Sequence, residues 1–127
     1  MKKLRLCAAL LALLAPAVQA AKPGNSVLLI HGGAGVVRSE MTPADEVAVR
    51  AALELALRKG HDQLAAGKPA LDAVTAAITV LEDDPHFNAG KGAVFTHDGK
   101  NELDSSLMDG ATLKAGAVAG VRTVKNP

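Results

Sequence analysis

Apolar positions change their spacing along the chain, and each change predicts a different element. Residues 26–30, SVLLI, form a short continuous apolar run rich in branched side chains, which predicts a strand buried on both faces. A helical pattern follows between Thr42, a good N-cap, and Gly67, a good terminator. Within it, apolar residues recur every fourth position, so we expect one buried face made of Val47, Ala51 and Leu55.

A second helix is predicted over residues 68–84. Pro69 suits its opening turn, and its apolar residues fall on one face, namely Leu71, Val74, Ile78 and Leu81. The connection at Gly67–Pro69 is short, so the two helices are expected to lie antiparallel.

The pattern then becomes one of strands. Residues 92–110 show a turn signal at Asp98–Gly99 followed by alternation through Leu103 and Leu107, which predicts a β-hairpin. Residues 112–124 predict a further strand of small residues. The expected fold class is therefore α+β, with the helices on one face of a sheet. Such a sheet needs a second apolar layer on its other face, so the chain is expected to be incomplete.

The first twenty residues follow a different pattern, that of a secretory signal peptide. Basic residues at positions 2, 3 and 5 precede an apolar run from Leu6 to Ala15, and Val18 and Ala20 provide small residues before a cleavage site. A membrane anchor is the alternative, but the run is too short to span a bilayer. We expect a mature domain of residues 21–127, located in the periplasm or secreted.

Composition narrows the possible chemistry. Cleavage after Ala20 removes Cys7, the only cysteine, so the mature chain would offer no thiol nucleophile and no thiolate ligand. The net charge is +1 and only two residues are aromatic, which argues against nucleic acid or an anionic membrane as a partner. The core must consist mainly of Ala, Val and Leu, and we expect it to be tightly packed.

The segment HGGAG, residues 31–35, is the first candidate site. Gly32, Gly33 and Gly35 permit positive φ angles and a close approach of backbone to another group. An oxyanion hole, a substrate cradle and a simple tight turn are all compatible with them. His31 has no evident partner for base catalysis and is expected to be structural, with its ring hydrogen-bonded to the backbone.

The second candidate is the segment LEDDPHFNAGKGAVF, residues 81–95. Its adjacent acidic residues point in different directions at a helix end, which disfavours a side-chain metal site. Pro85 and the nearby glycines bend the backbone, so main-chain carbonyls could instead surround a hard monovalent cation. Asn88 is expected to tie two loops together or to meet a substrate. Ser105 and Ser106 lack the context of a nucleophile and are expected to be polar strand positions.

These motifs together resemble one family. LLIHGGAG, LEDDPHFNAGKGAVFT, ELDSSLMDG and LKAGAVAGV occur in this order in plant-type isoaspartyl peptidases/L-asparaginases, which are N-terminal-nucleophile hydrolases. The resemblance covers residues 26–127. It implies a four-layer αββα sandwich, incomplete in this chain, and hydrolysis of β-aspartyl dipeptides and L-asparagine.

The resemblance also implies where the chemistry resides. In this family a precursor cleaves itself, and a threonine in a Gly-Thr-Val-Gly context becomes the N-terminal nucleophile of a second, β subunit. None of the six threonines here has that context, so no catalytic residue is expected in this chain. His31, Gly32, Gly33, Gly35 and Asn88 would shape the active site, and an (αβ)2 dimer is implied.

No cofactor is implied for the chemistry, but a structural sodium ion is. Carried over by position, its ligands would be the main-chain carbonyls of Leu81, Glu82, Asp84, Phe87, Ala89 and Lys91.

The alternatives to an isoaspartyl peptidase/L-asparaginase are a glycosylasparaginase-like amidase, an α/β-hydrolase with a His-Gly-Gly oxyanion hole, and a catalytically inert product. Paired helices after residue 42 disfavour the α/β-hydrolase, which builds its sheet from alternating strands and helices.

Overall fold

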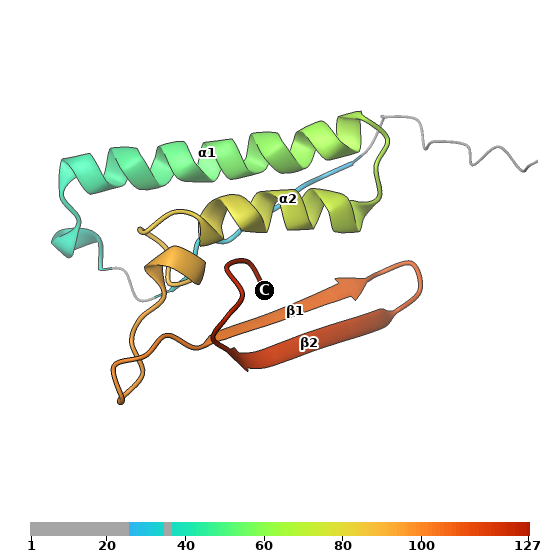
Figure 1. Ribbon diagram of the computed structural model, residues 1–127. Coiled ribbons are helices and arrows are strands. Elements are labelled where there is room, and N and C mark those ends of the chain that lie inside the picture. Colours follow the sequence, from blue (N-terminus) through green and yellow to red (C-terminus); the bar gives the residue numbers. More distant parts are fainter. Residues whose placement is uncertain (1–25, 35–36) are drawn as a thin grey trace, which may run out of the picture.

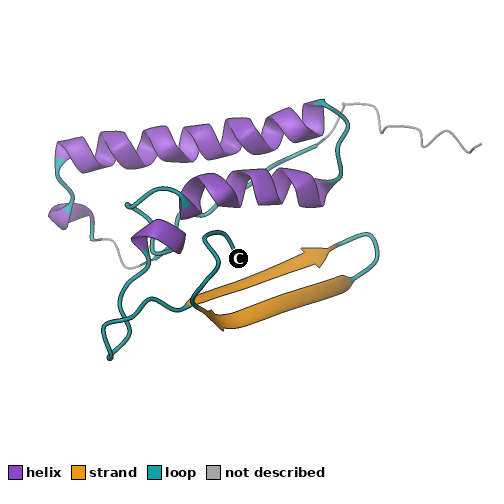
Figure 2. Cartoon of the chain, viewed as in Figure 1, coloured by secondary structure: helices purple, strands orange, loops and turns teal. Residues whose placement is uncertain are grey.

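The computed structural model describes residues 26–34 and 37–127 and consists of a helical layer above a β-hairpin (Figures 1 and 2). Helices α1 (Pro43–Ala65) and α2 (Ala70–Glu82) form the upper layer. Strands β1 (Leu103–Asp109) and β2 (Lys114–Val121) form the lower one, and short 3₁₀ turns, η1 and η2, cover Arg38–Glu40 and Gly90–Gly92. The α+β prediction is therefore confirmed. Neither described helix has the length and apolarity needed to cross a membrane.

Helix α1 begins with the cap that its sequence predicts. The Asp45 backbone N–H donates to Thr42 Oγ1 at 3.1 Å, and the Thr42 backbone N–H donates to Asp45 Oδ2 at 3.2 Å. This reciprocal pair satisfies two N–H groups that the helix leaves without partners. The Thr42 hydroxyl also donates to Asp45 Oδ2 at 2.6 Å, and this hydrogen bond, followed by that of the Thr42 backbone N–H, holds the pKa of the Asp45 carboxyl below its usual value.

The turn between the helices is equally local in origin. Gly67 adopts a φ of 72°, and the N–H of Lys68 reaches the carbonyl of Gln63 at 2.9 Å. The N–H of Gly67 donates to the carbonyl of Leu64 at 3.0 Å, completing a Schellman motif. Pro69 lies one position before α2, as its N-cap. The chain thus reverses within four residues, as predicted.

Small side chains hold the two helices together. Ala52, Ala56 and Gly60 lie one turn apart along α1, and they are buried together with Ala73 and Ala77 of α2. A Cβ added to Gly60 would lie 2.9 Å from the Ala73 carbonyl oxygen and 3.3 Å from the Ala77 Cβ. The backbones therefore approach too closely for larger side chains, and the prediction of a tightly packed core of small residues is confirmed.

The predicted buried face of α1 is wrong. Val47 is 69% exposed and Leu55 is 47% exposed, and Ala51 is also exposed. On α2, Leu81 is buried as predicted, but Ile78 is 42% exposed, and Leu71 and Val74 are only partly buried. Close helix packing selects the stripe with the smallest side chains, which displaces the larger apolar residues to the outside.

Residues 26–30 also differ from the prediction. They form no β-ladder within the described part of the chain, and they run beside the helices as a single segment (Figure 1). Leu28 and Ile30 turn inward, with Ile30 packed on the core, whereas Val27 and Leu29 are 81% and 85% exposed. The alternation is that of a strand buried on one face, not on both.

The hairpin lies further along the chain than predicted. The turn signal at Asp98–Gly99 does form a turn, in which Thr96 N–H donates to the Lys100 carbonyl at 2.7 Å, but no strand flanks it on the N-terminal side. Instead β1 pairs with β2 in antiparallel register. The Asp109 carboxylate organises the turn between them, accepting from Thr112 Oγ1 at 2.7 Å and from the Ala111 N–H at 3.0 Å.

Close helix packing generates a stability prediction with a matched control. Ala56 is fully buried at the interface of α1 and α2, whereas Ala51 is exposed on the same helix. Ala56→Val should lower the free energy of unfolding by about 1–3 kcal/mol through overpacking. Ala51→Val adds the same atoms and should cost no more than about 0.7 kcal/mol through helix propensity. Urea unfolding measures both, and equal losses would contradict the packing described.

Candidate functional site

The glycine segment after residue 30 is held by its own histidine. The Gly33 N–H donates to His31 Nδ1 at 3.3 Å, and Gly33 adopts a φ of 108°, a backbone conformation that other residues rarely adopt. His31 itself is exposed. This geometry agrees with the structural role predicted for the ring. Gly35 lies outside the described residues.

Gly32 brings this segment against the second candidate segment. A Cβ added to Gly32 would lie 2.9 Å from Cε1 of Phe87 and 3.2 Å from Cδ2 of Leu53. Phe87 is only 5% exposed and belongs to the core cluster with Ala56 and Leu81. Absence of a side chain at Gly32 therefore allows the two motifs, more than fifty positions apart in the sequence, to pack directly against each other.

The segment from Asp83 to Gly92 folds into a loop whose glycines lie close to main-chain carbonyls. A Cβ on Gly92 would meet the carbonyl oxygens of Phe87 and Pro85, and one on Gly90 would meet the carbonyl of Glu82. Gly90 also has a positive φ of 47°. Turn hydrogen bonds close the loop, including Ala89 N–H to Phe87 O at 2.8 Å and Gly92 N–H to Ala89 O at 3.0 Å.

Two of the six carbonyls predicted as cation ligands border these glycines, and the ion itself stays a prediction. Glu82 and Phe87 belong to the predicted set, and their carbonyls lie at the two glycines that permit close approach. Each carbonyl oxygen has two lone pairs, so those that already accept a turn hydrogen bond retain capacity for an ion. The carbonyl of Pro85, which was not among the predicted ligands, also borders Gly92. An oxygen-rich loop of this kind suits a hard cation.

The acidic side chains of the loop are engaged elsewhere. Asp84 Oδ1 accepts from the His86 N–H at 2.9 Å and lies 2.7 Å from His86 Nδ1. Burial raises the pKa of the Asp84 carboxyl, but the hydrogen bonds and charge of His86 outweigh it, so the pKa falls below its usual value. Within residues 26–34 and 37–127, no three His, Cys, Asp or Glu side chains gather as metal ligands.

Asn88 is exposed rather than buried. Its Oδ1 accepts from the Val94 N–H at 3.0 Å, and Asn101 Nδ2 donates to the carbonyls of Ala93 and Val94 at 2.7 and 3.2 Å. The two asparagines thus fix the strand-like segment after η2 from both sides. Asn88 thus links the 83–92 loop to the segment that follows η2, whereas its contact with a substrate stays a prediction.

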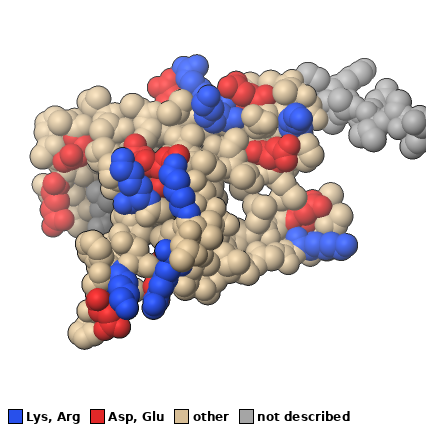
Figure 3. Space-filling view, viewed as in Figure 1, with Lys and Arg blue, Asp and Glu red and all other residues tan. Residues whose placement is uncertain are grey.

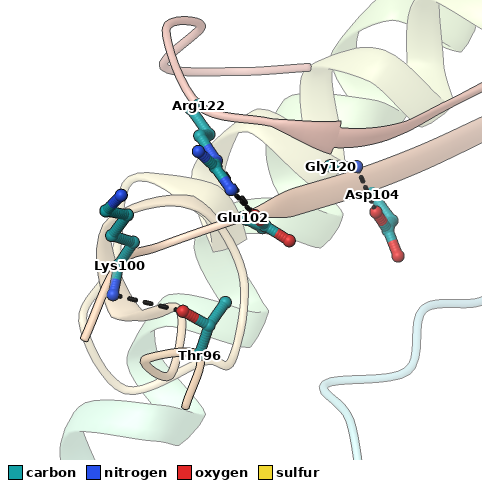
Figure 4. Close-up of polar contacts among 6 residues, drawn as sticks. All are labelled: Thr96, Lys100, Glu102, Asp104, Gly120 and Arg122. Carbon is teal, nitrogen blue, oxygen red and sulfur yellow. Dashed lines mark hydrogen bonds and ion pairs between the residues drawn. The ribbon is translucent and has the colours of Figure 1, made fainter. Parts of the chain in front are cut away.

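Further polar contacts, which sequence reasoning missed, secure the hairpin. Arg122 Nε donates to Glu102 Oε1 at 2.9 Å, the Gly120 N–H donates to Asp104 Oδ1 at 2.8 Å, and the Lys100 N–H donates to Thr96 Oγ1 at 3.2 Å (Figure 4). Gly120 has a φ of 64° and stands at an irregularity in the strand register, as in a bulge. Ser105 and Ser106 occupy β1, as predicted for polar strand positions.

The surface shows mixed charges and a hollow between the two layers. Acidic and basic side chains are interspersed on the face drawn in Figure 3, where a gap separates the helical part from the hairpin. A groove of about 730 Å³ lies there, bordered by Leu71 of α2, by Leu107 of β1 and by Val118 of β2. Leu107 and Val118 are 39% and 46% exposed. Both side chains therefore present apolar surface to the groove between the layers.

Comparison with known proteins places these motifs in a family. A family model described as asparaginase matches residues 24–127. The chain is 51% identical over 105 residues to the isoaspartyl peptidase of Escherichia coli (strain K12), covering 82% of this chain and 33% of that protein. It is 54% identical over 101 residues to a plant-type L-asparaginase of Pyrococcus abyssi, covering 79% and 32%.

A mammalian relative is similar as well. The isoaspartyl peptidase/L-asparaginase of Mus musculus is 43% identical over 113 residues, which cover 89% of this chain and 34% of that protein. This chain therefore spans about a third of the length of the curated relatives it matches. Because the family match includes both the glycine segment and the carbonyl-rich loop, the chain belongs to the asparaginase family.

Proposed function

We propose that this chain forms the N-terminal part of an amidohydrolase that cleaves β-aspartyl dipeptides and L-asparagine. Support comes from the relatives, which are named isoaspartyl peptidases and L-asparaginases. The observation that carries the proposal is the contact of Gly32 with Phe87, because it joins two of the segments that resemble this family, LLIHGGAG and LEDDPHFNAGKGAVFT.

The chemistry would depend on residues beyond Pro127. We infer that a threonine released by self-cleavage acts as nucleophile, with its own α-amine as base. The segments described above would shape the site around it, including His31, Gly32, Gly33, Gly35 and Asn88. The exposed Val27 and Leu29 support a larger αββα sandwich completed by a β subunit, and two such αβ units would form the dimer.

Export and ion binding belong to the same proposal. The residues before Ala21 would direct the protein to the periplasm or outside the cell, which N-terminal sequencing of the mature protein would reveal as a start at Ala21. Sodium would stabilise the loop through the main-chain carbonyls of Leu81, Glu82, Asp84, Phe87, Ala89 and Lys91. It would neutralise the partial negative charge of these oxygens and would take no part in bond cleavage.

The assignment of the nucleophile predicts where activity resides. Residues 21–127 alone should not hydrolyse L-asparagine or a β-aspartyl dipeptide, because they contain no nucleophile with an adjacent base. The complete polypeptide, including the downstream threonine, should cleave itself and then hydrolyse both substrates. Ammonia release and dipeptide cleavage measure this. Turnover by residues 21–127 that Ser105→Ala or Ser106→Ala removes would contradict the proposal, and preference for a glycosylated asparagine would favour the glycosylasparaginase-like alternative.

The main-chain ion site predicts an unusual mutational pattern. Sodium chloride should raise the thermal midpoint of the complete protein above that in choline chloride, because an ion that binds the folded state stabilises it. Glu82→Gln and Asp84→Asn should keep this rise, since neither carboxylate is a ligand. Gly92→Ala should abolish it, because its Cβ would intrude on the Phe87 and Pro85 carbonyls.

Gly116→Ala provides the control for that substitution. Gly116 lies on β2 with nothing within 4 Å of an added Cβ, so the sodium response should persist. Loss of the response in the two carboxylate variants, with retention in Gly92→Ala, would show that side chains rather than the backbone bind the ion.

A further inference from the structure

Glu82 is a buried acidic residue whose partner comes from the far end of the chain. It is 8% exposed, the one buried polar or charged residue among those the structure describes. Its Oε2 accepts a hydrogen bond from Asn126 Nδ2 at 2.9 Å, across 44 positions of sequence. A carboxylate withdrawn from water is costly unless it is hydrogen-bonded, so the location of Glu82 depends on this amide.

The neighbouring residues reinforce the same attachment. Asn126 Nδ2 lies 3.3 Å from Asp83 Oδ1, and Lys125 Nζ lies 2.7 Å from that same oxygen. Hydrogen bonds from Lys125 and then from Asn126 hold the pKa of the Asp83 carboxyl below its usual value. The end of α2 is thus attached twice to the segment after β2.

This segment is positioned between the two layers. The C-terminal end lies between α2 and β1 (Figure 1). Asn126 and Pro127 border a small cavity of about 130 Å³ together with Ile78 and Glu82 of α2 and Ser105 of β1. The amide of Asn126 therefore reaches the end of α2 from the side of the hairpin.

From Glu82 a continuous path of close contacts leads to the candidate site. The Glu82 carbonyl and Cβ border Gly90, where an added Cβ would come within 2.9 Å of the Glu82 Cβ. Gly92 borders the carbonyls of Phe87 and Pro85, and the Phe87 ring borders Gly32. Displacement of Glu82 would therefore disturb the loop at Gly90, which the Glu82 carbonyl borders.

We propose that Asn126 is a positioning residue that holds the 83–92 loop in place by hydrogen-bonding the buried carboxylate of Glu82. The consequence for catalysis rests on the proposed function, whereas the effect on the loop does not. Asn126 would touch neither substrate nor ion. Its effect would depend on keeping Glu82 in place. Lys125 would contribute little to the position of the loop, because its side chain, which forms the ion pair with Asp83, is 74% exposed.

Backbone amide hydrogen exchange of the complete protein tests this directly. Asn126→Asp replaces the donor with a carboxylate facing Glu82, and should accelerate exchange across residues 83–93 at least tenfold while the centre of α1 exchanges as before. Glu82→Gln alone should resemble the parent protein, because the Gln oxygen still accepts from Asn126. The double variant Glu82→Gln/Asn126→Asp reverses donor and acceptor, and should recover at least half of the logarithmic change. Lys125→Gln should leave loop exchange within twofold of the parent protein.

Three results would overturn the proposal. They are unchanged loop exchange in Asn126→Asp, equal acceleration in the loop and in α1, and a double variant no more protected than Asn126→Asp. If Asn126→Asp does not fold, Asn126→Ala serves instead. This variant must accelerate amide exchange across residues 83–93 but not at the centre of α1. Because exchange needs no substrate, a protein with this pattern but without amidase activity would refute only the proposed function. An active amidase without the pattern would refute only the role of Asn126.

Discussion

The close contact between α1 and α2 is the constraint on which the rest of the structure depends. Ala56 is fully buried and Gly60 leaves no room for a Cβ beside Ala73, so the two backbones meet with almost no side chain between them. Dispersion between well-packed small groups and removal of apolar surface from water stabilise such an interface. It fixes the end of α2, and the 83–92 loop begins there. Phe87 from this loop then closes the core, against which Gly32 packs.

The candidate site follows from what this packing leaves for the backbone. Glycines at positions 32, 90 and 92 stand where a side chain would collide with an aromatic ring or a carbonyl. Without side chains at these positions the backbone can approach these groups, while Asp84 is hydrogen-bonded to His86 and Glu82 to Asn126. The acidic side chains of the loop are thus engaged with other residues, and the proposed sodium site relies on main-chain oxygens.

Features encoded by neighbouring residues could be predicted from the sequence. The Thr42 cap and the Gly67 turn need only a few adjacent side chains and one positive φ, so α1 and its end were predicted correctly. The buried face of α1 was not, because hydropathy favours Val47 and Leu55 whereas close packing requires the smaller Ala52 and Ala56. The hairpin was misplaced because Asp98–Gly99 is a strong turn signal, whereas the actual turn depends on the Asp109 side chain.

Non-local contacts in the site left no signal in the sequence. The pairing of Glu82 with Asn126 spans 44 positions, and no spacing rule connects them. Likewise, the glycines of residues 31–35 indicated a close approach of some kind, but only the fold identifies Phe87 as the group approached.

The central claim, that Gly32 and Phe87 join the two motifs into one site, is tested most directly by a rescue experiment on the thermal midpoint of the complete protein. Gly32→Ala should lower the midpoint because its Cβ meets the Phe87 ring, and Phe87→Leu in the same chain should restore part of the loss by making room. Gly33→Ala serves as control, since its cost comes from a φ of 108° with open space around it, and Phe87→Leu should not restore it. Strict additivity at Gly32, or equal rescue at Gly33, would contradict the account.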